Sequence, residues 1–271
     1  NKAANLIKLA QELSTAVIYG TIYSLSNTQS SIQDRLGLLS LVTVGATNVG
    51  LASTIRAFPR ERDIVAADRA KRVYGVLPYF FAKMLAEAPV SAALSALSGC
   101  ILYPMVGLQA RWPKFFTFLG LNVLHNFASS GLGLMIGARA RSTEAALALM
   151  PPVIVLSIIF NGLNIAEEDT PRLLWWAPKV SVIRWGFEGM ALNEFRGLNF
   201  TCDRPVVQMC ATTGDEALAR VSTCFENSSV GKAAAAQAAL LGASYLCTIH
   251  ALGRNGPRYQ RMEPPAALPA A

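Results

Sequence analysis

Long apolar stretches are the feature that most constrains this chain. Runs such as Val76–Leu108 and Ala145–Leu163 carry few or no charged side chains. About 20 mostly apolar residues cross the hydrocarbon core of a bilayer as a helix, because each residue rises 1.5 Å. A β-barrel, the other structure that can cross lipid, would show strands of about 10 residues with alternating polarity. The sequence therefore predicts an all-α integral membrane protein.

The composition agrees with a membrane protein. The chain is 52% hydrophobic and 15% charged, whereas a soluble domain has about 25% charged residues. Its net charge of +7 fits basic cytoplasmic loops better than nucleic-acid binding, so we expect membrane lipids as partners and no nucleic acid. The chain starts at Asn1 without the pattern of a signal peptide, and we interpret it as part of a longer protein.

Six membrane spans are predicted, and basic residues divide their connections into two groups. Arginines concentrate between spans two and three, between spans four and five, and after span six. The positive-inside rule then places both termini in the cytoplasm. We expect a membrane domain over residues 1–252, an external segment over residues 166–229 and a cytoplasmic tail over residues 253–271. The predicted spans are Asn5–Leu25, Leu36–Phe58, Val76–Leu108, Phe115–Gly137, Ala145–Leu163 and Ala233–Leu252.

The external segment contains features of a secreted or lumenal environment. Asn199 and Asn227 each begin an N-x-[ST] sequon and are candidate glycosylation sites. Cys202, Cys210 and Cys224 are disulfide candidates in an oxidising compartment. One bond within the chain would leave a third thiol, which is either inert or bonded to a second subunit. Apolar residues at helical spacing over residues 182–195 predict an amphipathic helix on the outer membrane surface.

The connection between spans two and three mixes charged and apolar residues. Between Phe58 and Tyr74, charges interleave with Ile64, Val65 and Val73. This spacing predicts a short amphipathic helix on the membrane face. The helix is either held by anionic lipid or serves as a docking element for a cytoplasmic partner.

Several polar residues fall inside the predicted spans. Four of them share one face of span four, namely Asn122, His125, Asn126 and Ser129. Intramembrane polar groups are functional candidates, but interhelical hydrogen bonding is the more common role. We favour hydrogen bonding, because no second histidine or carboxylate inside a span is expected to supply His125 with a metal or proton-relay partner. Lys8 and Glu12 are expected at the level of the lipid headgroups, and no metal site is predicted.

Several patches together resemble one family of transporters. The positions that carry the resemblance are Phe58, Glu61, Arg62, Asp68, Arg69, Tyr74, Tyr79, Lys83, Glu87 and Pro89, followed by Asn161, Gly162, Leu163, Pro171, Trp176, Ser181, Glu188, Asn193, Glu194 and Phe195. In this order they resemble the membrane domain of the ABCG (White-type) ABC transporters, and residues 176–195 look like half-size members from plants and algae. Asp68 is a departure, because the family usually has Glu there.

The resemblance implies a fold and partners. The fold would be six helices of the ABC-2 type, with an amphipathic cytoplasmic coupling helix and an external segment between helices five and six. A second half-transporter subunit would complete a homo- or heterodimer. A nucleotide-binding domain would supply ATP and Mg chemistry, since this chain contains no G-x-x-x-x-G-K-[ST] motif. No catalytic residue is expected in this chain.

The resemblance also implies site residues. Coupling to the ATPase domain would use Glu61, Arg62, Asp68 and Arg69. The substrate cavity would be lined by Ala46, Val49, Ser53, Val155, Ile158, Phe160, Asn161 and Leu163. This apolar lining suits a lipid-like cargo that an exporter moves by alternating access, at the plasma membrane in preference to an internal one. A passive scramblase or channel, or a membrane scaffold or receptor without ATP coupling, remains the alternative.

Overall fold

The computed structural model describes the backbone of residues 2–70, 74–165, 170–201 and 210–254. The side chains of residues 2–4, 59–60, 62–64, 66–70 and 224 lie outside the description. Over the described ranges the chain is helical, and the extended segments form only two isolated β-bridges, Thr28 with Thr201 and Asn199 with Thr213. The predicted all-α fold is therefore confirmed.

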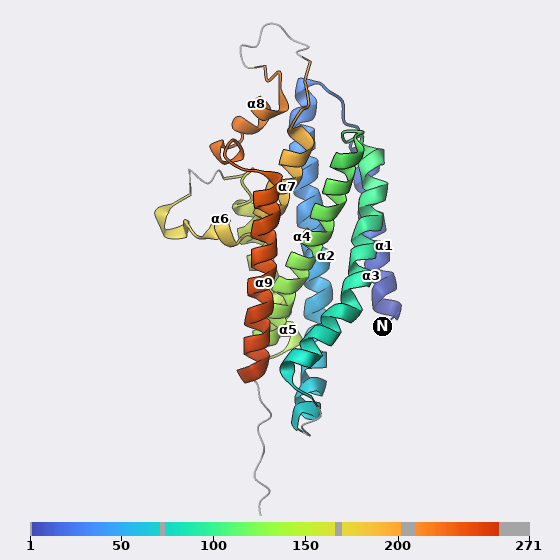
Figure 1. Cartoon of the computed structure of the whole chain (residues 1–271), viewed down its shortest axis with the longest axis vertical. Coiled ribbons are helices and arrows are strands. Elements are labelled where there is room, and N and C mark those ends of the chain that lie inside the picture. The colour runs from blue at the N-terminus through green and yellow to red at the C-terminus, as the bar shows by residue number, and fades with distance from the viewer. Residues whose placement is uncertain (1, 71–73, 166–169, 202–209, 255–271) are drawn as a thin grey trace, which may run out of the picture.

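Six long helices run side by side along the long axis of the molecule (Figure 1). They are α1 (Lys2–Ile22), α2 (Gln29–Ala70), α3 (Val76–Val106), α4 (Trp112–Arg139), α5 (Thr143–Ile159) and α9 (Val230–Arg254). Each of them overlaps one predicted span. By length and apolarity, Gln29–Phe58, Val76–Val106 and Val230–Arg254 could each cross a membrane, while the apolar helix α5 is shorter. Six crossings and the orientation of the termini remain predictions.

The second helix extends beyond the predicted end of its span. We predicted a separate short helix after Phe58, whereas α2 continues without interruption to Ala70 over 42 residues. Residues 51–70 contain no glycine and are rich in Ala and Arg, which are strong helix formers, and the helix continues through Pro59. Most of the predicted connection between spans two and three is therefore the last turns of α2. Figure 1 shows this part of the helix reaching one end of the molecule. We call this end the inner end, following the predicted topology.

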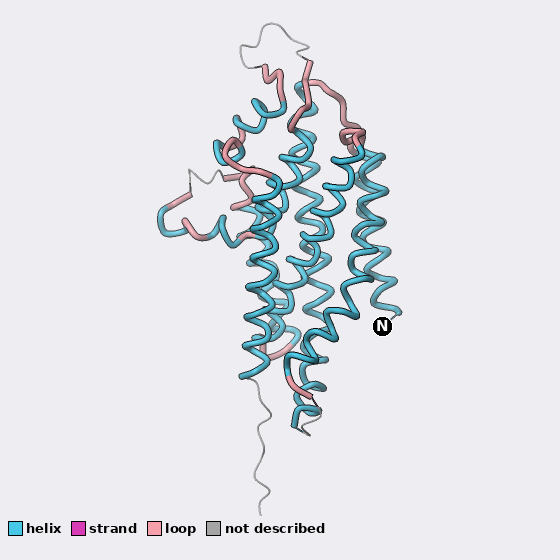
Figure 2. The backbone as a smooth tube through the Cα atoms, in the orientation of Figure 1, coloured by secondary structure: helices cyan, strands magenta, loops and turns pink. Residues whose placement is uncertain are grey.

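The opposite, outer end holds most of the loops and the short helices (Figure 2). The external segment forms α6 (Ala177–Val180), α7 (Val182–Phe195) and α8 (Gly214–Ala219), with 3₁₀ turns at Arg172–Leu174 and Thr223–Phe225. Cys210 is disulfide-bonded, while Cys202 and the side chain of Cys224 lie outside the described residues. Asn199 and Asn227 are both exposed, and their glycosylation stays a prediction.

Helix α4 is the centre of the bundle and packs against α2, α3, α7 and α9. Glycine makes the contact with α2 close. A Cβ at Gly133 would lie 3.0 Å from Thr54 Cβ and 3.1 Å from the Leu51 carbonyl oxygen. Small residues of this kind allow two membrane helices to approach at backbone distance.

Helix α7 forms at the predicted residues but not at the predicted place. Every residue of α7 except Trp185 is buried, and α7 packs against α2, α4 and α9. A Cβ at Gly186 would lie only 2.4 Å from His125 Nδ1, so glycine is required where α7 meets α4. The prediction of a helix on the outer membrane surface is wrong, because the polar residues of α7 are paired inside the protein instead of facing water.

Candidate functional site

An ion-pair cluster joins α2 and α3 at the inner end. The Lys83 ammonium pairs with the Glu61 carboxylate and lies 2.6 Å from Glu87 Oε1. It also lies 5.8 Å from the centroid of the Phe58 ring. The Lys83 side chain is 7% exposed, whereas those of Glu61 and Glu87 are 39% and 52% exposed. One buried cation therefore holds two half-exposed carboxylates, one on each helix.

Glu61 is the only one of the four predicted coupling residues whose side chain is described. Arg62, Asp68 and Arg69 lie on the last turns of α2 with side chains outside the described residues. Glu61 itself is bonded to α3 through Lys83. Glu61 therefore links the inner part of α2 to α3.

Next to this cluster lies a cavity of about 370 Å³, which we call the inner polar cavity. Residues of α1, α2, α3, α4 and α9 line it, so it is internal to one chain. Its polar lining includes Lys8, Ser53, Glu61, Lys83, Glu87 and Ser91. Lys8 is only 8% exposed and donates to Ser91 Oγ at 3.2 Å.

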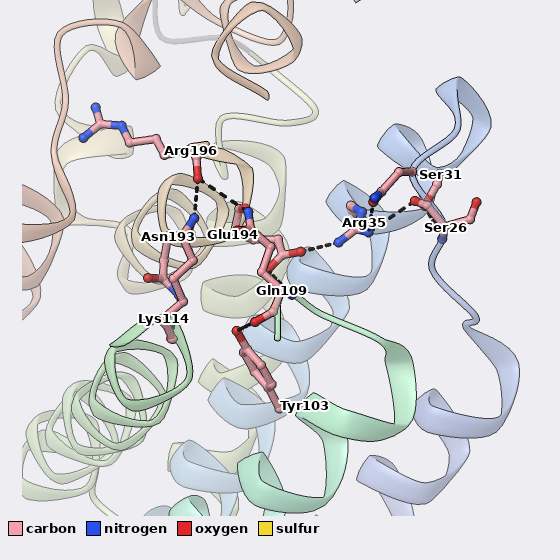
Figure 3. A network of polar contacts seen from close by, with 10 residues as sticks. Ser26, Ser31, Arg35, Tyr103, Gln109, Lys114, Asn193, Glu194 and Arg196 are labelled. Atoms are coloured by element: carbon pink, nitrogen blue, oxygen red, sulfur yellow. Dashed lines mark hydrogen bonds and ion pairs between the residues drawn. The ribbon is translucent and has the colours of Figure 1, made fainter. Parts of the chain in front are cut away.

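The outer end is closed by a denser network centred on Glu194 (Figure 3). Glu194 on α7 forms an ion pair with Arg35 on α2, and both side chains are almost completely buried. The backbone N–H of Gln109 donates to Glu194 Oε2 at 3.2 Å, and the Gln109 side chain donates to the Glu194 carbonyl. Tyr103 donates its hydroxyl hydrogen to the Gln109 carbonyl at 2.6 Å. These bonds tie α2, α3 and α7 to the loop between α3 and α4.

Two further contacts extend the same network. Lys114 at the start of α4 donates to the carbonyl of Asn193 at 2.8 Å and to that of Arg196. Asn193 returns a hydrogen bond to the Lys114 carbonyl at 3.0 Å. On the other side, Arg35 donates to the Ser26 carbonyl at 3.2 Å. The loop between α1 and α2 is thereby fixed to the same cluster.

A third polar group lies in the middle of the bundle around His125. Nε2 is 2.9 Å from the Thr43 carbonyl, which can only accept, so Nε2 carries the hydrogen. Nδ1 then accepts from the Gln237 amide at 2.9 Å. Thr47 lies 3.0 Å from Nε2. His125 is thus a neutral side chain that joins α4 to α2 and α9.

The neighbouring asparagines bond to the other helices. Asn122 donates to the Ser95 carbonyl on α3 at 2.8 Å, and Asn126 donates to Glu12 Oε1 on α1 at 3.4 Å. The predicted interhelical role of this face of α4 is confirmed. Lys8 and Glu12 are each 8% exposed and are buried among the helices, and their expected position at the level of the lipid headgroups stays a prediction. Glu12 is thus a carboxylate of the first predicted span that bonds to this face of α4, which we did not expect.

The predicted cavity residues do not gather at one place within this chain. Ala46 and Val49 line a cavity of about 50 Å³ between α1, α2, α3 and α4, with Glu12. Ser53 lines the inner polar cavity. Phe160 and Asn161 are buried and line a void of about 10 Å³ beside α7.

The remaining cavity candidates lie on other surfaces. Val155 is 54% exposed. Ile158 packs with a cluster that contains Leu51 and Ile154, and Leu163 packs against the main core. A cavity shared with a second subunit stays a prediction, and the contact between α2 and α5 is the part that this chain contains.

The sequence analysis did not predict the polar contacts of several charged residues. Their position inside apolar runs was the signal that could have indicated these contacts. Lys83 and Glu87 stand in the third predicted span, and Lys8 and Glu12 stand in the first. A charge inside a membrane helix is costly unless it is paired, so each one indicates a partner on another helix. Arg35 and Glu194 lie outside the predicted spans, but they are also buried and paired across two helices at the outer end.

Comparisons with known proteins agree with this architecture. The ABC-2 type transporter family matches residues 1–195. The chain is 36% identical over 260 residues to ABC transporter G family member 7 of Arabidopsis thaliana, covering 96% of this chain and 35% of that protein. It is 29% identical over 190 residues to Protein white of Drosophila melanogaster, covering 70% of this chain and 28% of that protein.

A mammalian relative extends the same pattern. The Broad substrate specificity ATP-binding cassette transporter ABCG2 of Sus scrofa is 28% identical over 202 residues, covering 74% of this chain and 31% of that protein. The chain thus spans about a third of the length of these curated relatives. It belongs to the ABC-2 type transporter family, as a membrane domain of the ABCG (White-type) kind.

Proposed function

We propose that this chain is the translocation domain of an ATP-driven exporter for lipid-like or other hydrophobic small molecules. Membership of the ABC-2 type transporter family supports a role in transport. The observation that carries the proposal is the uninterrupted helix α2, which runs from the outer end to Ala70 and is bonded to α3 through Glu61 and Lys83. Such a helix would deliver a displacement at its inner end to the rest of the bundle.

The proposed mechanism is alternating access driven by a partner domain. A nucleotide-binding domain, closing on ATP and Mg, would push the inner turns of α2, where Glu61, Arg62, Asp68 and Arg69 lie. Two packings of the bundle, one open to each side, would be populated according to the nucleotide bound. The Lys83 ammonium contacts carboxylates of both α2 and α3, so it would keep these helices together during the change.

A second copy or a related subunit would complete the cargo pathway. The outward face of α5 carries exposed apolar side chains, including Leu149, Val155, Leu156 and Ile159. A partner subunit or lipid would cover this face, because contiguous apolar surface is unfavourable in water. Cargo that crosses beside this face would be hydrophobic. The assembly would lie in the plasma membrane.

The test is ATP hydrolysis by the full-length protein in lipid nanodiscs, measured with a panel of lipids and sterols. We expect one class of hydrophobic compound to stimulate hydrolysis, which would also identify the cargo class. If no compound and no partner subunit elicits ATP turnover, a passive scramblase or a scaffold becomes the better account.

A further inference from the structure

The inner polar cavity has two poles of opposite charge. At one pole stands Lys8 of α1, which is 8% exposed and has Ser91 Oγ as its hydrogen-bond partner. Glu12, four residues further along α1, and Glu87 on α3 are its nearest partners of opposite charge, but among the described side chains no carboxylate lies within 4.0 Å of the Lys8 ammonium. An ammonium group has three hydrogens to donate, and Ser91 Oγ accepts one of them, so Lys8 keeps capacity to donate to a further acceptor. This pole therefore favours an anionic group in the cavity.

Among the described side chains, the other pole has an excess of negative charge. Glu61 and Glu87 share the single ammonium of Lys83, and both carboxylates also line the cavity. They are 39% and 52% exposed, so their oxygens retain room for further donors. This pole favours a cation that can donate hydrogen bonds.

The separation of the poles follows from α3. Ser91, which receives the hydrogen bond from Lys8, stands one turn after Glu87 on this helix. Four residues of α-helix rise about 6 Å. A phosphate joined to a primary ammonium by two carbons can reach from one pole to the other.

Exposed apolar side chains lie close in sequence to the cavity residues, and Val90 itself lines the cavity. Leu6 and Ile7 on α1 and Leu85 and Val90 on α3 are between 40% and 79% exposed. They stand next to the cavity residues Lys8, Glu87 and Ser91 in the sequence of the same two helices. A ligand with a polar end in the cavity could lay hydrocarbon chains against this apolar surface.

We propose that the inner polar cavity binds the headgroup of a zwitterionic phospholipid with a primary ammonium, of the phosphatidylethanolamine type. The phosphate accepts hydrogen bonds from Lys8 and Ser91, and the ammonium donates to Glu87 and Glu61. A volume of about 370 Å³ is enough for such a headgroup. Phosphatidylcholine has no ammonium hydrogen to donate, and phosphatidylglycerol lacks the cation. The site lies within one chain and does not depend on ATP-driven export.

The test is native mass spectrometry of the full-length protein released from membranes that contain these three lipids at equal mole fractions. We expect phosphatidylethanolamine to be retained about tenfold over phosphatidylcholine, the effect of one hydrogen bond to a charged group. Glu87→Gln should remove this preference, whereas Lys8→Met should lower the retention of all three lipids, because each carries the phosphate. Lys232→Met, at an exposed lysine on the first turn of α9, should keep the preference.

Several results would overturn the proposal. Retention of phosphatidylglycerol at or above the level of phosphatidylethanolamine would mean that charge alone decides binding. Retention of no lipid would mean that the cavity does not bind a phospholipid headgroup in the full-length protein. Displacement by an equal concentration of soluble phosphoethanolamine would identify a soluble ligand in place of a lipid. The comparison of the three lipids on the unmodified protein needs no variant, so misfolding of a variant cannot decide the outcome.

Discussion

The two ends of the bundle use the same kinds of charged residue in opposite ways. At the outer end, Arg35 and Glu194 are buried and fixed by Gln109 and the surrounding backbone. At the inner end, Lys83 holds two half-exposed carboxylates beside a cavity of about 370 Å³. Buried charges that are held by several hydrogen bonds keep one arrangement, whereas half-exposed pairs beside a cavity can exchange partners. The comparison indicates a locked outer end and an adjustable inner end.

Breaking the outer network should have the largest effect. Glu194→Ala leaves Arg35 buried without its carboxylate, which should reduce the free energy of unfolding by about 3–5 kcal/mol. Thermal unfolding of the full-length protein in nanodiscs measures this loss. The double variant Arg35→Met with Glu194→Met should recover most of the stability, because it leaves no unpaired charge. A single variant as stable as the unmodified protein would remove the basis for a locked outer end.

The packing of α7 against α4 should give the next largest effect. Gly186→Ala places a Cβ 2.4 Å from His125 Nδ1 and 2.9 Å from Gln237 Nε2. Overpacking of this kind costs about 1–3 kcal/mol. Gly242→Ala on α9 is the matched control, because its Cβ would meet nothing within 4 Å. Equal unfolding temperatures for the two variants would show that α7 does not pack closely against α4 and α9 at Gly186.

The inner cluster should affect function more than stability. Glu61→Gln removes one of two partners of Lys83, and the free energy of unfolding should fall by no more than about 1 kcal/mol, since Glu61 is 39% exposed. Cargo-stimulated ATP hydrolysis should fall well below that of the unmodified protein, while basal hydrolysis persists. Glu216→Gln, in an exposed pair with Arg220 on the external segment, is the control. Full stimulation in the Glu61 variant would contradict the coupling role.

The smallest effect is expected at Glu216 itself. The backbone N–H of Thr212, followed by Arg220, lowers the pKa of this carboxyl below its usual 4.5. A lowered folded pKa contributes stability above pH 4.5, and this contribution disappears as the pH falls through the lowered value. When the pH is lowered from neutral to acidic, the unfolding temperature of Glu216→Gln should therefore fall slightly less than that of the unmodified protein. An identical pH profile for the two proteins would show that these bonds do not form in solution.

Apolar patterning predicted the helices well and their surroundings poorly. The run over residues 182–195 predicted the bounds of α7 correctly, but it was interpreted as an amphipathic helix at the surface. Its polar side chains are buried because partners arrive from other helices, as Arg35 does for Glu194 across 159 positions. Glu12 and Asn126 meet across 114 positions. Local periodicity contains no information about such distant partners.

The candidate site was predicted in part for the same reason. The family motif identified Glu61, but its bond to Lys83 depends on how α2 and α3 pack. The amphipathic pattern after Phe58 suggested a separate helix, because changes of polarity do not reveal whether a helix continues. The predicted cavity residues Ala46 and Val155 face different surroundings in one chain. Their common role depends on a second subunit, which a single sequence does not position.

The most direct test of the central claim is the movement of fluorescent lipid analogues into inside-out vesicles that contain the full-length protein. An ATP-driven exporter predicts accumulation that requires ATP and Mg and is reduced by Glu61→Gln but not by Glu216→Gln. Movement of the same size without nucleotide would contradict the account, and it would identify the helices as a passive path for lipids.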